Sequence, residues 1–376
     1  MNFQRIHNAW VGRYGDSKDW SWGAEIESSR SESDGTIAFG DHALDRTSGR
    51  IQLLGPDSQT DLVFGYQDKF FGLPGMYTGD EAVNRETEDI QTRLIVLNHL
   101  LEYDSESFLE ASAFHRRLSD HFILRRNNPS VYQAFQETEV NGVAVSGFHA
   151  LNAELGFNYS GQLTSDQIET TSTVPFNKRD YYKFSLVPQY KDFLKDSEII
   201  TLKAGVSFDD SNRDSSKISP IAEIRWSRPN RVVGSETMYF SYSETTQVLG
   251  YTALAQALGF TGDPNLRRGS SKNLELGYEV SNSKWKFSGA IFKRWDDDLV
   301  DWVYDINDTR SARHVDMETF GFELIASRSW QNFQTIGSYT FLEKDEDYGD
   351  PSITRSIYAL NFPEHRATLG LIWNPI

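Results

Sequence analysis

The stretch SKNLELGYEV, from Ser271 to Val280, alternates polar or small residues with apolar residues from Asn273 onward. One face of an extended strand would carry its apolar residues Leu274, Leu276, Tyr278 and Val280. The opposite face would carry its polar or small residues Asn273, Glu275, Gly277 and Glu279. The stretch therefore predicts a β-strand with one face toward an apolar environment and the other toward water.

The same two-residue period recurs along the whole chain, for example in IITLKAGVSFDD (199–210) and HRATLGLIW (365–373). It predicts about seventeen strands, many of them near the ~9–11 residues that cross a bilayer obliquely. Their ranges are 3–14, 20–29, 47–55, 60–69, 86–101, 106–125, 135–148, 153–171, 179–191, 197–209, 217–227, 235–244, 270–281, 284–304, 312–328, 332–343 and 364–373. YTALAQALGF (Tyr251–Phe260) is the one stretch that favours a short helix.

Composition limits the class of protein. The 376 residues carry a net charge of -17 and no cysteine, which excludes nucleic-acid binding, disulfides and thiolate metal sites. The mean hydropathy is -0.53, and no apolar run approaches the roughly 18 residues of a membrane helix. Aromatic residues nevertheless make up 13% of the chain. This combination is typical of an antiparallel transmembrane β-barrel, whose strands turn apolar residues to lipid and polar residues inward.

The expected connections alternate in length. Short ones include YGDSKD (14–19), GPDSQ (55–59) and SNS (281–283), and long ones include residues 30–47, 245–269 and 344–362. Outer-membrane barrels sort their connections in this way, with short periplasmic turns and long extracellular loops. Tryptophans near the strand ends, such as Trp285 and Trp330, fit an aromatic girdle at the membrane interfaces.

Two other functions remain open at this point: a passive porin-like channel and a soluble β-rich binding module. An enzymatic function is not supported by any catalytic motif. The sequence has no nucleophile elbow, phosphate-binding loop or zinc motif, so it does not predict an enzyme.

Several segments together resemble the barrel of a TonB-dependent outer-membrane receptor of the cobalamin- or siderophore-receptor type. They are GYQDKFFGLPGMYT (65–78), YFSYSETTQVLGYTAL (239–254), GDPNLRRGSSKNLELGYEV (262–280), METFGFELIAS (317–327) and PEHRATLGLIW (363–373). In the third segment Asp263 replaces the usual Asn. The match runs over essentially all of residues 1–376.

The resemblance implies one partial receptor barrel, with about seventeen of 22 strands and without a plug domain. It implies energy-coupled uptake of a scarce large nutrient, such as a siderophore, cobalamin or similar chelate, across the outer membrane of a Gram-negative-type bacterium. The implied partners are outer-membrane lipid, the nutrient, and the TonB complex through the plug. Because the resemblance makes the chain a fragment with unpaired edge strands, we expect these 376 residues alone not to transport.

Candidate ligand-binding residues lie in the expected extracellular loops: Tyr77, Tyr251, Arg267 and Arg268. The loop from Thr245 to Gly269 adds the apolar residues Leu249, Leu254, Leu258 and Phe260. An apolar surface with nearby cations would suit a large, partly anionic ligand. The alternative is that these side chains pack the loop on itself. For Phe70 and Phe71 we favour packing.

Metal and polar sites are weaker predictions. In DDSNRD, Asp210, Asn212 and Asp214 have EF-hand-like spacing, but Ser215 and Ile221 stand where that loop needs Gly and Glu. We therefore expect no cofactor, with calcium in an extracellular loop as the alternative that the resemblance implies. Three glutamates on the expected inner face could line a transport path or bond to a plug and to inner arginines: Glu275, Glu279 and Glu323. WDDDLVDW (295–302) is expected to be a polar loop edge rather than a cation site.

Overall fold

All seventeen predicted strand ranges correspond to strands in the computed structural model, which describes residues 4–77, 79–80, 83–230, 234–257, 260–307, 309–356 and 362–373. Within that part of the chain three further strands are short: β13 (Gln256–Ala257), β14 (Phe260–Thr261) and β19 (Ile353–Ser356). The only α-helix of the described residues is the single turn α1 (Tyr251–Leu254). Among these residues, no helix is long and apolar enough to cross a membrane.

The chain divides into two compact units. Unit 1 comprises Met1–Phe148, Ser160–Tyr182 and Ser211–Arg213, and unit 2 comprises His149–Tyr159, Lys183–Asp210 and Asp214–Ile376. The strands β8 (Leu155–Thr170), β9 (Lys178–Phe193) and β10 (Ile199–Ser211) contribute residues to both units.

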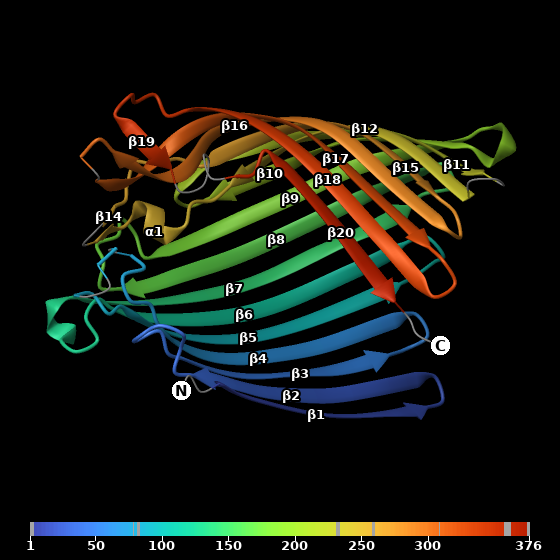
Figure 1. The fold of residues 1–376 in the computed structure, drawn as a ribbon. Coiled ribbons are helices and arrows are strands. Elements are labelled where there is room, and N and C mark those ends of the chain that lie inside the picture. Colours follow the sequence, from blue (N-terminus) through green and yellow to red (C-terminus); the bar gives the residue numbers. More distant parts are fainter. Residues whose placement is uncertain are drawn as a thin grey trace. The chain divides into compact units, whose positions relative to one another are not determined.

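Unit 1 contains an antiparallel meander in which each strand pairs with the next along the chain (Figure 1). Its strands are β1 (Gln4–Ser17), β2 (Trp20–Ser33), β3 (His42–Leu54), β4 (Ser58–Gly72), β5 (Thr87–Glu102), β6 (Phe108–Ile123) and β7 (Gln133–Ala150).

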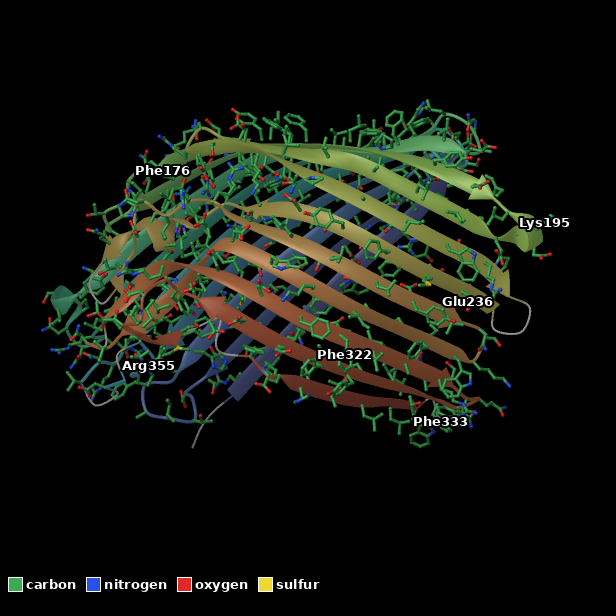
Figure 2. All side chains as sticks on the ribbon, turned by 90° about the horizontal axis from the view of Figure 1, so that it is seen from above. Phe176, Lys195, Glu236, Phe322, Phe333 and Arg355 are labelled. Atoms are coloured by element: carbon green, nitrogen blue, oxygen red, sulfur yellow. The ribbon has the colours of Figure 1, made fainter. Side chains whose placement is uncertain are left out.

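Unit 2 also contains an antiparallel meander of long strands, and its short strands β13, β14 and β19 lie in the connections between them. The long strands pair in the order in which they are listed: β11 (Asp214–Asn230), β12 (Gly234–Gln247), β15 (Gly269–Ser281), β16 (Trp285–Asp305), β17 (Arg310–Ser329), β18 (Phe333–Asp347) and β20 (His365–Trp373). Within this unit Arg355 lies at one end of the strands, and Lys195, Glu236 and Phe333 lie at the other (Figure 2).

The alternation of connection lengths is largely confirmed. At one end of the strands each connection is a short turn, as at residues 18–19, 55–57 and 282–284. At the other end most are long: 34–41, 73–86, 124–132, 171–177, 248–268 and 348–364. The turns at 212–213 and 306–309 are short exceptions on this end. We call the two ends the short-turn end and the long-loop end.

The two faces of the strands differ as predicted. Leu276 and Tyr278 are 42% and 36% exposed on one face of β15, and Glu275 and Glu279 line a cavity on the other. On β5 the apolar face presents Ile95 and Leu97, also largely exposed. A chain in water rarely exposes apolar residues in such continuous rows, so this apolar face fits a lipid environment.

The apolar rows do not run the full length of the strands. On the same face of β5, beyond Ile95 toward the long-loop end, come Arg93, Gln91 and Asp89. Four apolar positions at every second residue, as on β15, span six residue steps, which is roughly 20 Å along the strand and roughly 15 Å along the membrane normal at a tilt of roughly 40°. That height falls within the roughly 25 Å apolar band of a transmembrane barrel, and the polar ends of the longer strands extend beyond this band.

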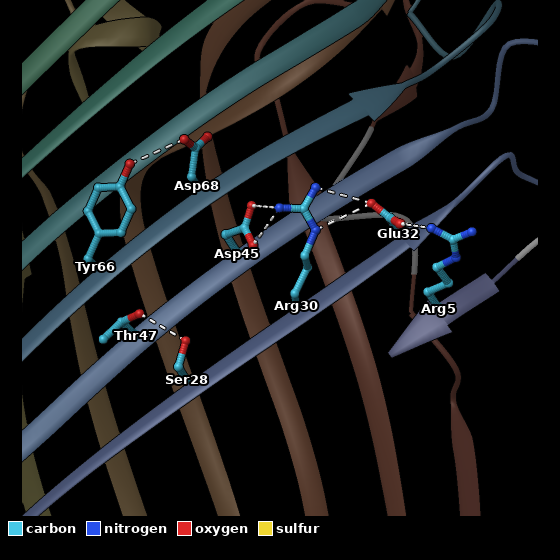
Figure 3. A network of polar contacts seen from close by, with 8 residues as sticks. All are labelled: Arg5, Ser28, Arg30, Glu32, Asp45, Thr47, Tyr66 and Asp68. Carbon is cyan, nitrogen blue, oxygen red and sulfur yellow. Dashed lines mark hydrogen bonds and ion pairs between the residues drawn. The ribbon is translucent and has the colours of Figure 1, made fainter. Parts of the chain in front are cut away.

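Figure 3 shows the polar end of this face in unit 1, where ion pairs and hydrogen bonds join neighbouring strands. Arg30 lies between Glu32 at 3.1 Å and Asp45 at 3.3 Å, and Arg5 lies 3.4 Å from Glu32. Exposed pairs of this kind stabilise by only about 0–1 kcal/mol each. Their main consequence is that this part of the strands is suited to water or headgroups rather than to hydrocarbon.

Candidate functional site

The three glutamates predicted on the inner face come together in unit 2. Glu275, Glu279 and Glu323 line one open cavity of about 470 Å³ on the polar face of β12, β15, β16 and β17. Arg294 also lines it, but Asp296 binds its Nε at 2.7 Å. Hydroxyl groups and an amide form much of the remaining wall, together with the apolar Ala290, Phe292 and Ile325. The cavity therefore offers hydrogen bonds and an excess of negative charge beside an apolar part.

A chain of polar contacts leads to this cavity across four strands of unit 2. Lys203 on β10 lies 3.1 Å from Glu223 on β11, whose carboxylate also accepts from Arg225 at 3.2 Å. Arg225 stacks over the ring of Tyr239 at 4.9 Å, and the Tyr239 hydroxyl donates to Glu275 at 2.7 Å. The contacts of Lys203 and Glu275 are consistent with the predicted inward position of both residues.

The ring of Tyr239 depends on a glycine across the strand pair. Gly277 is directly opposite Tyr239, and a Cβ at Gly277 would lie 2.2 Å from the ring. A glycine therefore leaves the space in which the ring lies flat and reaches Glu275.

Gly277→Ala is expected to push the Tyr239 ring away, break its hydrogen bond to Glu275 and destabilise the fold by about 1 kcal/mol. The matched control is Gly337→Ala in β18, where the new Cβ would meet nothing closer than 3.9 Å. Denaturant midpoints of the two variants would check this. A shift at Gly337 as large as at Gly277 would contradict the role assigned to the ring.

The predicted ligand residues of the long loop lie in different environments. Tyr251 in α1 is only 7% exposed, beside a small core in which Ala253 packs with Trp302 and Ala312. This burial favours the alternative in which the loop packs on itself. Leu258 lies outside the described residues. The predicted helix is shorter than expected, because after Leu254 the chain turns into the two-residue strands β13 and β14.

The two arginines of this loop also differ. Arg267 has a side chain 72% exposed, and its guanidinium reaches Asp298 at 3.4 Å. Arg268 has a side chain only 6% exposed, and its Nε lies 3.4 Å from Asp214. The backbone N–H of Arg268 also donates to the Asp214 carboxylate at 3.1 Å. Arg268 therefore holds the base of the loop to β11, whereas Arg267 is accessible to a ligand.

The residues with EF-hand-like spacing have partners of their own. Asp214 pairs with Arg268 in unit 2, and in unit 1 Asn212 exchanges hydrogen bonds with Asp180. Asp210 belongs to β10 itself. Over the described ranges, no three His, Asp or Glu side chains are grouped closely enough to hold a metal ion.

Phe70 and Phe71 lie at the end of β4, and Tyr77 lies in the connection from β4 to β5, in unit 1. Tyr77 is 49% exposed; its ring meets the edge of Phe122 at 5.4 Å, and its hydroxyl lies 3.5 Å from Glu88. Phe70 lies under the Arg126 guanidinium at 5.1 Å, and both Phe70 and Phe71 are partly buried. These positions agree with packing for the two phenylalanines.

Three connections of unit 1 are tied together at the long-loop end. Arg126, from the 124–132 connection, binds both carboxylate oxygens of Asp41 at 2.6 and 2.9 Å. The carbonyl of Asp41 accepts from the N–H of Gly72, and Arg126 donates its own N–H to the carbonyl of Arg85. Hydrogen bonds from Arg126 hold the pKa of Asp41 below its ordinary value, although burial acts in the opposite direction.

Arg126→Ala is expected to loosen these connections at neutral pH. A lowered folded-state pKa means that the ionised Asp41 stabilises the fold above its unfolded pKa of about 4, and that this is lost as pH falls further. Hydrogen exchange in residues 34–41 should therefore be faster in Arg126→Ala than in the parent at pH 7, and the difference between the two should shrink as the pH falls below about 4. Arg117→Ala, which removes an ion pair between strands, is the control. Unchanged exchange at pH 7 would contradict the clamp.

A further polar site was missed by the sequence reasoning. In WDDDLVDW, Asp301 is 1% exposed and accepts from the hydroxyls of Tyr348 at 3.0 Å and Ser356 at 2.7 Å. The 348–364 connection is thereby fastened to β16. The segment was expected to be a polar loop edge. Its residue Asp301 is instead buried and binds the 348–364 connection through two hydrogen bonds. Burial and the Asp301 carboxylate raise the pKa of Tyr348.

Long antiparallel strands with an apolar band on one face, and charged networks and a hydrophilic cavity on the other, define a transmembrane β-barrel domain. The family model for the TonB-dependent receptor-like β-barrel matches residues 34–375. The chain therefore belongs to the TonB-dependent receptor family and is part of its barrel. This family and its solved structures are transport receptors, not enzymes.

Solved structures support the same fold. The ferric preacinetobactin receptor BauA of Acinetobacter baumannii is 11% identical, with a TM-score of 0.63 over 99% of this chain and 65% of its own. The alcaligin outer-membrane receptor FauA of Bordetella pertussis is 16% identical, with a TM-score of 0.60 over 99% and 65%. The copper transporter OprC is 11% identical, with a TM-score of 0.64 over 93% and 63%.

At these identities the likeness shows the fold alone. The chain spans 63–65% of the length of these three structures. A search of curated proteins by sequence found no match.

Proposed function

We propose that the chain is the barrel part of an energy-coupled importer in the outer membrane of a Gram-negative-type bacterium. Its cargo would be a scarce large nutrient, such as a siderophore, cobalamin or similar chelate. The observation that carries the proposal is the row of exposed apolar side chains on one face of the strands, with polar side chains toward the strand ends and the long connections at one end in each unit. The long-loop end would face outside and the short-turn end the periplasm.

A plug domain would fill the space beside the polar face and link it to the TonB complex. The cavity lined by Glu279 and Glu323 offers carboxylates that basic or hydroxyl side chains of such a plug could bind. Each unit has an exposed side chain at its long-loop end that a ligand could meet: Tyr77 in unit 1 and Arg267 in unit 2. Tyr251 and Arg268, which are buried, would support the loop, and the proposal includes no cofactor.

Fractionation and uptake test this function. The intact receptor should be recovered from the outer-membrane fraction only with detergent, and cells carrying it should accumulate a radiolabelled ferric chelate or cobalamin. Collapse of the inner-membrane proton gradient should stop that accumulation. Recovery in a soluble fraction would contradict the membrane assignment, and uptake that survives the collapse would indicate a passive pore instead.

In the intact receptor, Arg267→Ala is expected to weaken ligand binding by about tenfold, because an exposed guanidinium can form a charged hydrogen bond with the ligand. Folding, judged by heat-modifiable gel mobility, should be unchanged. Tyr251→Ala is expected to affect the loop itself, because the side chain of Tyr251 is buried and its removal should loosen the packing of the loop. If Arg267→Ala leaves affinity intact, the ligand contact lies elsewhere.

A further inference from the structure

The polar face of unit 1 ends, at the long-loop end, in two rows of side chains that the strand register fixes. The outer row across β4, β5 and β6 is Phe71, Glu88 and Phe122. The row next to it is Lys69, Ile90 and Asp120. Glu88 and Asp120 are therefore diagonal neighbours on adjacent strands, roughly 7 Å apart at their backbones.

Aromatic side chains from two connections lie beside Phe122: Tyr77 from residues 73–86 and Tyr132 from residues 124–132. Tyr77 stands edge-on to Phe122, with 85° between the ring planes, and its hydroxyl lies 3.5 Å from Glu88. On the other side of Phe122 lies Tyr132, with ring centroids 6.2 Å apart. Tyr77 remains half exposed, so a molecule arriving at the long-loop end can reach the aromatic row.

Two carboxyl groups here have one lysine near them. Oδ1 of Asp120 is buried and has no hydrogen-bond partner among the described residues. Lys69 from β4 and Glu88 from β5 are the charged groups that act on Asp120 from its own face. Asp89 and His121 also act on it, from strand positions on the opposite face. On β7 its neighbour is Gln136, which is uncharged.

We propose that Tyr77, Glu88, Asp120, Phe122 and Tyr132 form a binding site for an organic cation, which we call the rim site. Its ligand would be a protonated amine or quaternary ammonium group attached to an apolar or aromatic body. Aromatic faces attract such cations through their quadrupole, and carboxylates attract them by charge. A bound ammonium would also supply the partner that Oδ1 of Asp120 lacks.

If the proposed transport function holds, the rim site sets the class of substrate. The imported nutrient then carries an amine or ammonium group in addition to the partly anionic character that the loop arginines suggest. Burial and the charge of Glu88 raise the pKa of Asp120 to about 6. A cation needs the ionised carboxylate, so affinity should rise as the pH increases through 6 and level off above it.

The test uses the protein extracted from membranes in detergent and two probes of matched shape. Phenethylamine is a cation at pH 7.5, and 2-phenylethanol is its neutral counterpart. Calorimetry or ligand-observed NMR should show saturable binding of the amine and about tenfold weaker binding of the alcohol. Glu88→Gln with Asp120→Asn should lower amine affinity by about tenfold or more.

Two control variants distinguish a loss of the binding site from a general change in charge and from a loss of folding. Asp68→Asn removes a carboxylate from the opposite face of β4 and should leave amine affinity unchanged. Asp120→Asn alone replaces a carboxylate whose Oδ1 has no partner among the described residues, and the variant should fold like the parent, as heat-modifiable mobility would show. Equal affinity for the two probes, or amine binding unchanged by Asp120→Asn, would overturn the rim site. Amine binding without any chelate uptake in cells would instead overturn the transport function and leave the rim site standing.

Discussion

Leu276→Arg is expected to destabilise the folded protein in a bilayer by about 2–4 kcal/mol, whereas Glu275→Arg at the adjacent position should cost little. Leu276 lies on the apolar face of β15, opposite Phe240 on one side and Ile291 on the other. An arginine there would place a guanidinium in hydrocarbon. Glu275 points to the cavity that Glu279 and Glu323 also line, where a cation meets water and carboxylates.

Refolding into lipid vesicles at increasing urea, followed by gel mobility, measures both costs. Leu276→Ala separates the loss of apolar surface from the burial of charge, and it should cost less than Leu276→Arg. The intact receptor is the suitable protein, because its strands are all paired. Equal costs of arginine at positions 275 and 276 would show that the two faces have been assigned wrongly.

The strands could be predicted from the sequence because period-two alternation is a local property of each strand. The range 86–101 corresponds to Thr87–Glu102, and 284–304 corresponds to Trp285–Asp305. The largest shift at a strand start is in β3, which begins at His42 rather than at residue 47. Its first residues do not alternate in polarity, because the apolar Ala43 and Leu44 are adjacent and lie on opposite faces, so the two-residue period is hidden there.

The long-loop end was less predictable, because its contacts join residues far apart in the chain. Apolar residues at 249–260 could equally meet a ligand or one another, and composition does not separate the two. Tyr251 and Leu254 are buried in the turn α1, whose Ala253 packs in a core shared with β16 and β17. Arg268 likewise meets Asp214, 54 residues earlier. Such pairings depend on the strand order and on the bulge in β16 between Asp296 and Leu299.

For the candidate site, the sequence predicted the face of each glutamate but not their meeting point. Alternation places Glu275 and Glu323 inward, and they line one cavity only because β15 and β17 are both paired with β16 in a particular register. The rim site depends in the same way on register across β4, β5 and β6. Neither register follows from the spacing of residues within one strand.

Trp302→Ala is expected to cost about 3–5 kcal/mol of local stability at the long-loop end, while the barrel strands remain folded. Trp302 is 8% exposed, packs with Ala253 and Ala312, and lies beneath the Arg310 guanidinium at 4.9 Å. Removing the indole leaves a cavity that small neighbours cannot fill.

Limited proteolysis within 248–268 measures the effect, because an unpacked connection is cut much faster than a packed one. The control is Trp330→Ala at the short-turn end, where the ring is 37% exposed and stacks on Phe333 at 4.5 Å. That variant should not change cleavage within 248–268. Because α1 and the base of the loop share one core with β16 and β17, the cut should extend to residues around Ala253. If Trp302→Ala leaves the connection resistant, the loop is held by its ion pairs, such as Arg268 with Asp214, rather than by its apolar core.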